Sequence, residues 1–181
     1  MADENKNKLR CFIAIDFPRE IIKEVERVQN EIKKKNIFAG KFTEGENLHL
    51  TLKFLGEIDF ERIEEVKKKL AEIKFGKFMA YLGELGVFNS DFIRIIWIHI
   101  LGKQIIDLQN EIDKKMAECE FKREERFMSH LTIARVKNIK DKKIFLEKLK
   151  KVRVQNLGFL VDKLYLIKSE LKEEGPVYSV L

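Results

Sequence analysis

Hydrophobic residues follow two alternating periods along this chain, one typical of helices and one typical of strands. After Pro18, apolar residues recur every three or four positions, and proline is well tolerated in the first turn of a helix. Helical spacing predicts helices over residues 21–32, 60–73, 105–116 and 141–150. Strand patterns predict strands over residues 9–16, 47–55, 75–88, 93–101, 129–136, 159–166 and 176–181, with a hairpin turn at residues 89–91.

The predicted elements occur in a similar order in the two halves of the chain. Each half has a strand that carries a histidine, with a helix before it and a helix after it. We therefore expect an α+β fold, bilobal and pseudo-duplicated, with antiparallel sheets that face each other across a central cleft and helices packed outside. The chain has 181 residues, 45% of them hydrophobic, and only two prolines, so we expect a single two-lobed domain over residues 1–181. Residues 1–8 are largely polar and are expected to be frayed.

Two of the predicted strands carry the same tripeptide, His-Leu-Thr, at residues 49–51 and 130–132. The chain has only three histidines and three threonines, so two scarce residue types are used twice in one pattern. Side chains two positions apart in a strand share one face, about 6–7 Å from each other. His49 and Thr51 should therefore point the same way, as should His130 and Thr132, while the leucines point into a core.

Paired imidazoles can supply both an acid and a base near neutral pH, because the ordinary pKa of histidine is about 6.5. Threonine hydroxyls can donate hydrogen bonds to phosphoryl oxygens and hold a phosphate between the two rings. The pattern thus favours in-line displacement at phosphorus, with one ring activating the nucleophile and the other protonating the leaving oxygen. We expect no metal and no other cofactor, because neither a recurrent ligand spacing nor a glycine-rich phosphate loop is present.

These residues resemble a known family, the two-histidine phosphoesterases with paired HxTx motifs. Within it, the chain resembles the RNA 2′,3′-cyclic phosphodiesterases, also called the 2′-5′ RNA ligase family. The first motif with its flanks reads NLHLTLKFLGE over residues 47–57, and the second reads FMSHLTIAR over residues 127–135. Weaker likenesses are found at residues 10–15, 86–97 and 168–178.

The resemblance implies hydrolysis of 2′,3′-cyclic phosphate ends of RNA to 2′-phosphomonoesters, with possible reverse 2′-5′ ligation. It implies that His49 is the proton donor, that His130 is the proton acceptor, and that Thr51 and Thr132 bind the phosphate. Spacing alone does not decide which histidine is the acid. In the ligation direction the two roles must exchange.

Two basic residues near the motifs are further candidates for substrate binding. Arg135 matches a phosphate-contacting arginine of the family, but strict alternation from His130 places it on the opposite face, so it reaches the cleft only if the strand ends or bulges. Lys53 lies four positions after His49 and is expected on the same face, where it would meet RNA phosphate or simply cap the strand. Ser129 stands where the family often has proline.

Several other residues allow both a structural and a functional interpretation. Phe42, Phe88, Trp97 and Phe127 could stack a base, although aromatic residues in strands more often belong to the core. His99 has no threonine two positions later and is expected to be a core or edge histidine. Lysine-rich runs mix with acidic residues and favour solvated helix faces.

Composition adds expectations about partners and location. A net charge of +6 mildly favours a polyanionic partner, here RNA with a cyclic phosphate end, such as a tRNA fragment. Two cysteines, no predicted signal peptide and no membrane-spanning run lead us to expect a cytoplasmic location. We also expect a monomer. The Lys and Glu bias is typical of hyperthermophile proteins. Two alternatives stay open: an RNA-end binding protein with little turnover, and a two-histidine enzyme for a small cyclic nucleotide.

Overall fold

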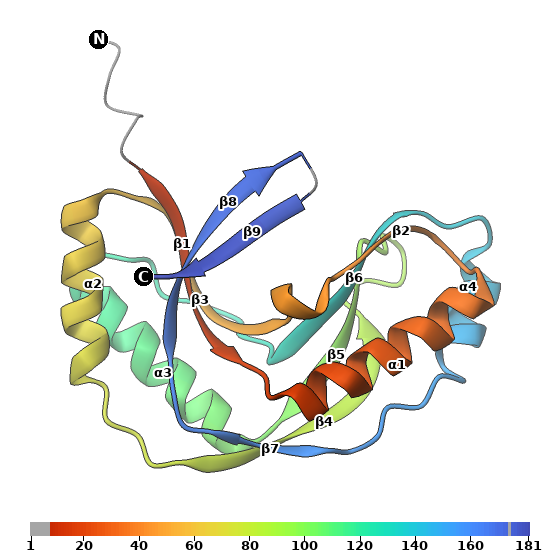
Figure 1. The fold of residues 1–181 in the computed structure, drawn as a ribbon, viewed down its shortest axis with the longest axis horizontal. Helices are drawn as coiled ribbons and strands as arrows, with labels where there is room; N and C mark the ends of the chain where they lie inside the picture. The colour runs from red at the N-terminus through yellow and green to blue at the C-terminus, as the bar shows by residue number, and fades with distance from the viewer. Residues whose placement is uncertain (1–7, 174) are drawn as a thin grey trace, which may run out of the picture.

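Two antiparallel sheets form the centre of the structure, a computed structural model that describes residues 8–173 and 175–181 (Figure 1). The first sheet has the strand order β3-β1-β8-β9 and the second has the order β2-β6-β5-β4-β7. The first sheet contains β1 (Leu9–Asp16), β3 (His49–Ile58), β8 (Tyr165–Lys172) and β9 (Gly175–Val180). The second contains β2 (Ala39–Phe42), β4 (Phe78–Val87), β5 (Ile95–Leu101), β6 (His130–Asn138) and β7 (Gly158–Val161).

Four α-helices among the described residues surround these sheets: α1 (Arg19–Lys35), α2 (Phe60–Glu72), α3 (Lys103–Glu118) and α4 (Lys142–Leu149). Two of them begin at an aspartate that accepts a hydrogen bond from the first turn, Asp59 before α2 and Asp141 before α4. Helix α1 ends at Asn36, which adopts a left-handed conformation with φ of 46°. The prediction of an α+β fold with helices outside two antiparallel sheets is confirmed.

The helix of each half packs on the sheet that carries the other half's histidine. Helix α1 lies between β1 and β3 in sequence but contacts β6 of the second sheet, and α3 lies between β5 and β6 in sequence but contacts β3 of the first. One apolar core joins both sheets and all four helices. The two halves are therefore interlocked, and neither sheet is built from one half of the chain alone.

The last third of the chain differs from its prediction. The strand expected over residues 159–166 is two strands, because β7 ends at Val161 in the second sheet and β8 begins at Tyr165 in the first. The prediction of one strand was wrong, since a hydrophobic run does not show where the chain crosses between sheets. Strand β2 was not predicted at all. The expected fraying of residues 1–8 lies, except for Lys8, outside the described residues.

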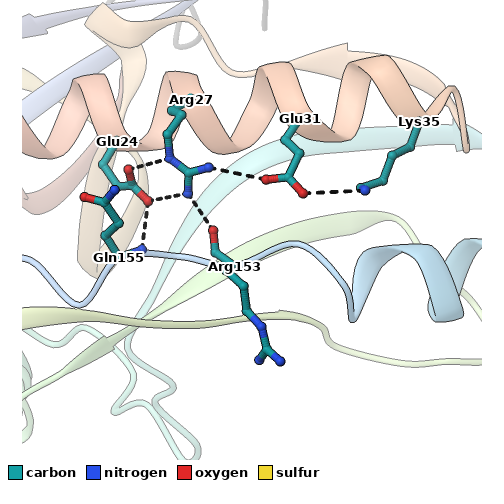
Figure 2. A network of polar contacts seen from close by, with 6 residues as sticks. All are labelled: Glu24, Arg27, Glu31, Lys35, Arg153 and Gln155. Atoms are coloured by element: carbon teal, nitrogen blue, oxygen red, sulfur yellow. Dashed lines mark hydrogen bonds and ion pairs between the residues drawn. The ribbon is translucent and has the colours of Figure 1, made fainter.

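A polar network fixes the segment between α4 and β7 against α1 (Figure 2). Glu24 is buried and accepts hydrogen bonds from Arg27 and from the backbone N–H of Gln155, while Arg27 donates to the carbonyl oxygen of Arg153 at 2.6 Å. Burial opposes ionisation of Glu24, but these hydrogen bonds hold its pKa below the usual range. The last connection into the second sheet is thus held in place by charge-assisted bonds. None of the described helices is long and apolar enough to cross a membrane.

Candidate active site

The two histidines of the repeated tripeptide occupy matching places in the two sheets. His49 is the first residue of β3 and His130 is the first residue of β6. These two strands belong to different sheets but contact each other at the centre of the molecule (Figure 1). The fold therefore brings together two motifs that lie 81 positions apart in the sequence.

Each imidazole is anchored in the same way. Nδ1 of His49 lies 2.8 Å from the carbonyl oxygen of Asn47, and Nδ1 of His130 lies 2.8 Å from the carbonyl oxygen of Met128. A carbonyl oxygen can only accept, so Nδ1 must carry the proton in both rings. In a neutral ring the lone pair is then on Nε2, which is the atom available for proton transfer.

Aromatic rings pack against both imidazoles. The centroid of His49 lies 4.7 Å from that of Phe12 and 5.0 Å from that of Tyr178, which meets it edge-on. The centroid of His130 lies 4.8 Å from that of Phe88, also edge-on. Because these rings and the Nδ1 hydrogen bonds act together, neither imidazole can rotate freely.

The surroundings lower the pKa of both histidines. Burial is the largest cause for each, because it disfavours the charged imidazolium. The positive charges of Arg135 and His130 lower the pKa of His49 further, whereas the Asn47 carbonyl and Asp16 oppose this. Burial thus favours the neutral form of both rings, and the charge of His130 adds to this effect at His49.

A hollow lies between the two motif strands. Its walls include Thr51 from the first motif and His130 from the second, together with the rings of Phe54, Phe88 and Phe127. Thr132 shares its strand face with His130 and lies opposite Trp97 in the register with β5. The hollow is thus bordered by hydroxyl, imidazole and aromatic groups. The described residues contain no group of three His, Cys, Asp or Glu placed to hold a metal ion.

Both motif strands bulge at the third residue after the histidine. In the pairing of β1 with β3, Ile13 faces Lys53 and Ala14 faces Thr51, so Leu52 has no partner. In the pairing of β5 with β6, Ile96 faces Ala134 and Trp97 faces Thr132, so Ile133 has no partner. A bulge inserts one extra residue, and it therefore reverses the faces of the residues that follow, as far as the next irregularity in the pairing.

The bulge in β6 turns Arg135 to the face of His130 and Thr132. Ile133 and Ala134 are both buried, and Arg135 is exposed, so alternation is broken at this point. Burial raises the pKa of Tyr178, and the Arg135 guanidinium lies close enough to oppose that rise and to lower the pKa of His49. Strict alternation would have placed Arg135 on the other face, and the bulge is the irregularity that allows it to share a face with His130.

The matching bulge in β3 has the opposite effect on Lys53. Its side chain is only 3% exposed, and its ammonium donates to the carboxylate of Asp113 in α3 and to the carbonyl oxygen of Lys122. The expectation that Lys53 shares a face with His49 was wrong, because the bulge turns it into the interior. Lys53 still borders the hollow, but its ammonium is paired with the buried carboxylate of Asp113.

Phe54 lies where Lys53 was expected. It occupies the place in β3 that Arg135 occupies in β6, it is 62% exposed, and it lines the hollow. Sequence reasoning missed Phe54 as a site residue. A signal was present, since apolar residues at 52, 54 and 55 break the alternation that begins at His49.

Strand β5 places two further aromatic residues beside the second motif. His99 faces His130 in the strand register and is half-buried in the middle of the sheet, so it is neither the core nor the edge residue that was expected. Trp97 lies against Gly86, where an added Cβ would come within 2.2 Å of the indole ring. The missing side chain of Gly86 therefore leaves the space that the indole occupies. Phe42 packs against the core and not in the hollow.

An interlocked pair of antiparallel sheets, each with one anchored His-x-Thr strand at a shared hollow, is the arrangement of the two-histidine phosphoesterases. The family model described as LigT like Phosphoesterase matches residues 15–97 and 101–178. The chain belongs to this family of phosphoesterases.

Similar proteins agree with this assignment. An RNA 2′,3′-cyclic phosphodiesterase of Methanocaldococcus jannaschii is 37% identical over 96% of this chain and 98% of the relative, and one of Thermotoga maritima is 32% identical over 96% and 93%. Among solved structures, TT0787 of Thermus thermophilus matches with a TM-score of 0.82 and 26% identity over 96% of this chain and 95% of the other. LigT of Escherichia coli in its apo form has a TM-score of 0.77 at 23% identity, over 97% and 96% of the two chains, and shares the fold.

Proposed function

We propose that the protein hydrolyses 2′,3′-cyclic phosphate ends of RNA to 2′-phosphomonoesters by acid–base catalysis with two histidines. The observation that carries this proposal is the matched pair of anchored imidazoles, each on a strand with a threonine on the same face. The two strands contact each other, and Thr51 from one strand and His130 from the other line one hollow. The names of the curated relatives support the substrate, since those compared above are RNA 2′,3′-cyclic phosphodiesterases.

In the proposed reaction, Nε2 of His130 takes a proton from a water molecule as the water oxygen attacks phosphorus. The bond from phosphorus to the 3′ oxygen breaks, and Nε2 of His49 gives its proton to that oxygen. The products are a 2′-phosphomonoester and a 3′-hydroxyl. The family resemblance supports this assignment of donor and acceptor, and the like anchoring of both rings would allow the roles to exchange in a reverse 2′-5′ ligation.

Thr51, Thr132 and Arg135 are proposed to bind the non-bridging phosphate oxygens. The hydroxyls would donate hydrogen bonds, and the guanidinium would stabilise negative charge as it develops in the transition state. Arg135 alone would disfavour a protonated His49, because it adds to the effect of burial in lowering the pKa of that ring. A bound phosphate would offset this charge, so we propose that the substrate itself prepares His49 to act as the acid.

The rings of Phe54, Phe88 and Phe127 are proposed to contact bases of the RNA end. Single-stranded RNA is commonly held by stacking on aromatic side chains, and Phe54 and Phe88 are both more than half exposed at the hollow. We propose an RNA end such as that of a tRNA fragment as the substrate, bound by a monomer. Both cysteines, Cys11 and Cys119, are buried free thiols, in keeping with the proposed cytoplasmic location.

Product analysis would test the proposal. An oligonucleotide with a 2′,3′-cyclic phosphate end is incubated with the protein in EDTA, and the phosphomonoester is identified by chromatography against 2′ and 3′ standards. We expect the 2′-phosphomonoester at an undiminished rate. A 3′-phosphomonoester, or loss of turnover on chelation, would contradict it.

The same assay separates the two alternatives. Binding of the oligonucleotide without turnover would favour an RNA-end binding protein. A kcat/KM for adenosine 2′,3′-cyclic phosphate higher than that for the oligonucleotide would favour an enzyme for small cyclic nucleotides.

A further inference from the structure

Helices α1 and α3 bury the same spacing of side chains, although their sequences differ. Counted from the first buried isoleucine of each helix, buried positions follow after three, four, seven, eight and eleven residues in both. These positions are Ile21, Glu24, Val25, Val28, Gln29 and Ile32 in α1, and Ile105, Leu108, Gln109, Ile112, Asp113 and Met116 in α3. Gln29 and Asp113 are therefore equivalent positions of the pseudo-duplicated fold.

Each of these two equivalent side chains reaches the bulge of the motif strand from the other half of the chain. Gln29 Nε2 donates to the carbonyl oxygen of Ile133, the unpaired residue of the β6 bulge, at 2.9 Å. The same nitrogen donates to the carbonyl oxygen of Thr43 at 2.8 Å, and the Thr43 N–H donates to Ile133 at 3.0 Å. In the other half, Asp113 accepts from Lys53, the residue next to the β3 bulge.

We propose that Gln29 and the Lys53–Asp113 pair are positioning residues that hold the two bulges and thereby set which side chain each motif strand presents to the cleft. Gln29 would act through Arg135, and the Lys53–Asp113 pair would act through Phe54. This inference rests on the proposed function, because it takes the cleft to be a phosphate and nucleotide site.

The physical reason is the two-residue period of a strand. If the bulge were lost, the residue five positions after each histidine would point to the opposite face, since a shift of one residue exchanges the faces. Bulges leave backbone groups outside the regular ladder, and such groups need other partners. Gln29 supplies a side-chain donor to the Ile133 carbonyl, and Lys53 can remain in the interior because Asp113 neutralises its charge.

Asp113 also organises the segment that leads to the second motif. Its carboxylate accepts from the backbone N–H of Glu124 at 3.0 Å and lies 3.4 Å from Nε of Arg123. The chain then continues through Phe127 and Met128, which line the hollow. One buried carboxylate thus connects the bulge of β3 with the wall of the cleft.

A double-mutant cycle tests the link between Gln29 and Arg135. Binding of inorganic phosphate is measured by calorimetry for the wild type, Gln29→Met, Arg135→Ala and the double variant. We expect Gln29→Met to weaken binding about tenfold when Arg135 is present and less than about twofold when it is replaced. An equal loss in both backgrounds would overturn the inference, since a merely structural role does not depend on Arg135.

Gln109→Met is the matched control. Gln109 is a buried glutamine of α3, the equivalent helix. Its Nε2 has no hydrogen-bond partner among the described residues. We expect Gln109→Met to show no coupling with Arg135, and coupling as strong as that of Gln29 would count against the inference. If Gln29→Met does not fold, Gln29→Ala takes its place in the cycle, because water can enter the space and reach the same carbonyls.

The role of the Lys53–Asp113 pair is tested by comparing how a substitution changes the affinity for adenosine 2′-monophosphate and for inorganic phosphate. Lys53→Met should weaken binding of adenosine 2′-monophosphate about fivefold, through loss of stacking on Phe54, and change phosphate binding by less than about twofold. An equal loss for both ligands would overturn this part. Asp113→Asn keeps the shape of the pair and replaces Lys53→Met if that variant does not fold.

Hydrolysis of adenosine 2′,3′-cyclic phosphate is measured on the same proteins. Coupling in phosphate binding without hydrolysis would support the positioning role and contradict the proposed function. Hydrolysis without coupling in phosphate binding would support the proposed function and contradict the positioning role. A wild type that bound no phosphate would overturn the inference together with the site on which it rests.

Discussion

Strands β3 and β6 follow the same course for three residues beyond their histidines and then present different chemistry to the cleft. Both have an anchored imidazole, a threonine two positions later and a bulge after the threonine. After the bulge, β3 presents the ring of Phe54 and β6 presents the guanidinium of Arg135. The comparison shows that the fold duplicates the anchored histidine and its threonine but not the side chain that follows the bulge. We therefore propose that the β6 side of the cleft binds phosphate and that the β3 side binds a base.

The largest effect should come from removing either histidine of the duplicated pair. His49→Ala and His130→Ala should each reduce kcat by about 10²- to 10⁴-fold, because in the proposed mechanism each ring transfers a proton in the same transition state. The double variant should be little worse than either single variant, since groups that act together are not additive. Single-turnover kinetics on a cyclic phosphate oligonucleotide would measure this, and nearly normal turnover in one variant would remove that histidine from the mechanism.

The next effect concerns the free energy of unfolding, to which Lys53 of β3 contributes through its buried pair with Asp113. Lys53→Met should lower the free energy of unfolding by about 3–5 kcal/mol, because it leaves the buried Asp113 carboxylate without its cation. Urea denaturation measures this change. Lys77→Met is the control, since Lys77 is 69% exposed in its pair with Asp162 and should cost at most about 1 kcal/mol. Similar losses in both variants would mean that the Lys53 pair contributes no more than a surface contact.

Replacing the two side chains that follow the bulges should separate their roles. Arg135→Ala should reduce kcat/KM by about 10- to 100-fold, because a charge-assisted contact to phosphate contributes about 1.5–3 kcal/mol. It should also lower the slope of log affinity against log salt for RNA by about one. Phe54→Ala should leave that slope unchanged and weaken RNA binding only. If the two variants had the same salt dependence, the proposed division of the cleft would be wrong.

The pH dependence of activity tests the lowered pKa of the two histidines, one in each motif strand. The profile of kcat/KM reports the free enzyme, and the pKa of both histidines is lowered there, so the bell should be centred below about pH 6.5. Activity should fall above this pH as the acid loses its proton, and below it as the base gains one. A maximum well above pH 7 would contradict the structure of the site.

Arg135→Ala should then move one limb of this bell. Burial is the largest cause of the lowered pKa of His49, and Arg135 adds to it, so removal of Arg135 should raise that pKa. If His49 is the acid, as proposed, the alkaline limb moves to higher pH and the acidic limb stays. Movement of the acidic limb alone would exchange the roles of the two histidines. This is the smallest effect, because the charge of Arg135 is exposed and screened by water.

Local sequence patterns were sufficient to predict most of the helices and strands and to place the two His-Leu-Thr motifs on strands. The alternation around each His-Leu-Thr placed His49, Thr51, His130 and Thr132 on two strands, because the period of a strand needs only the neighbouring residues. The helices followed from apolar spacing in the same way, and the hairpin of β4 and β5 from the turn residues between them. The motifs and their flanks also led to the family.

The predictions that were wrong concerned features that depend on contacts between distant segments of the chain. A bulge depends on the partner strand, so whether Lys53 or Phe54 faces the cleft could not be derived from β3 alone. The split of residues 159–166 into β7 and β8 required knowledge of both sheets.

The sequence by itself determined which groups are proposed to react, since a scarce pair of His-Leu-Thr tripeptides specifies two imidazoles and two hydroxyls on strand faces. Only the tertiary structure decided which neighbours assist them. Gln29 and Asp113 reach the bulges from helices of the opposite halves, and we propose that these contacts keep Arg135 turned outward and Lys53 turned inward. The reason is that side-chain direction after a bulge depends on hydrogen bonds to residues far away in sequence, which no local period encodes.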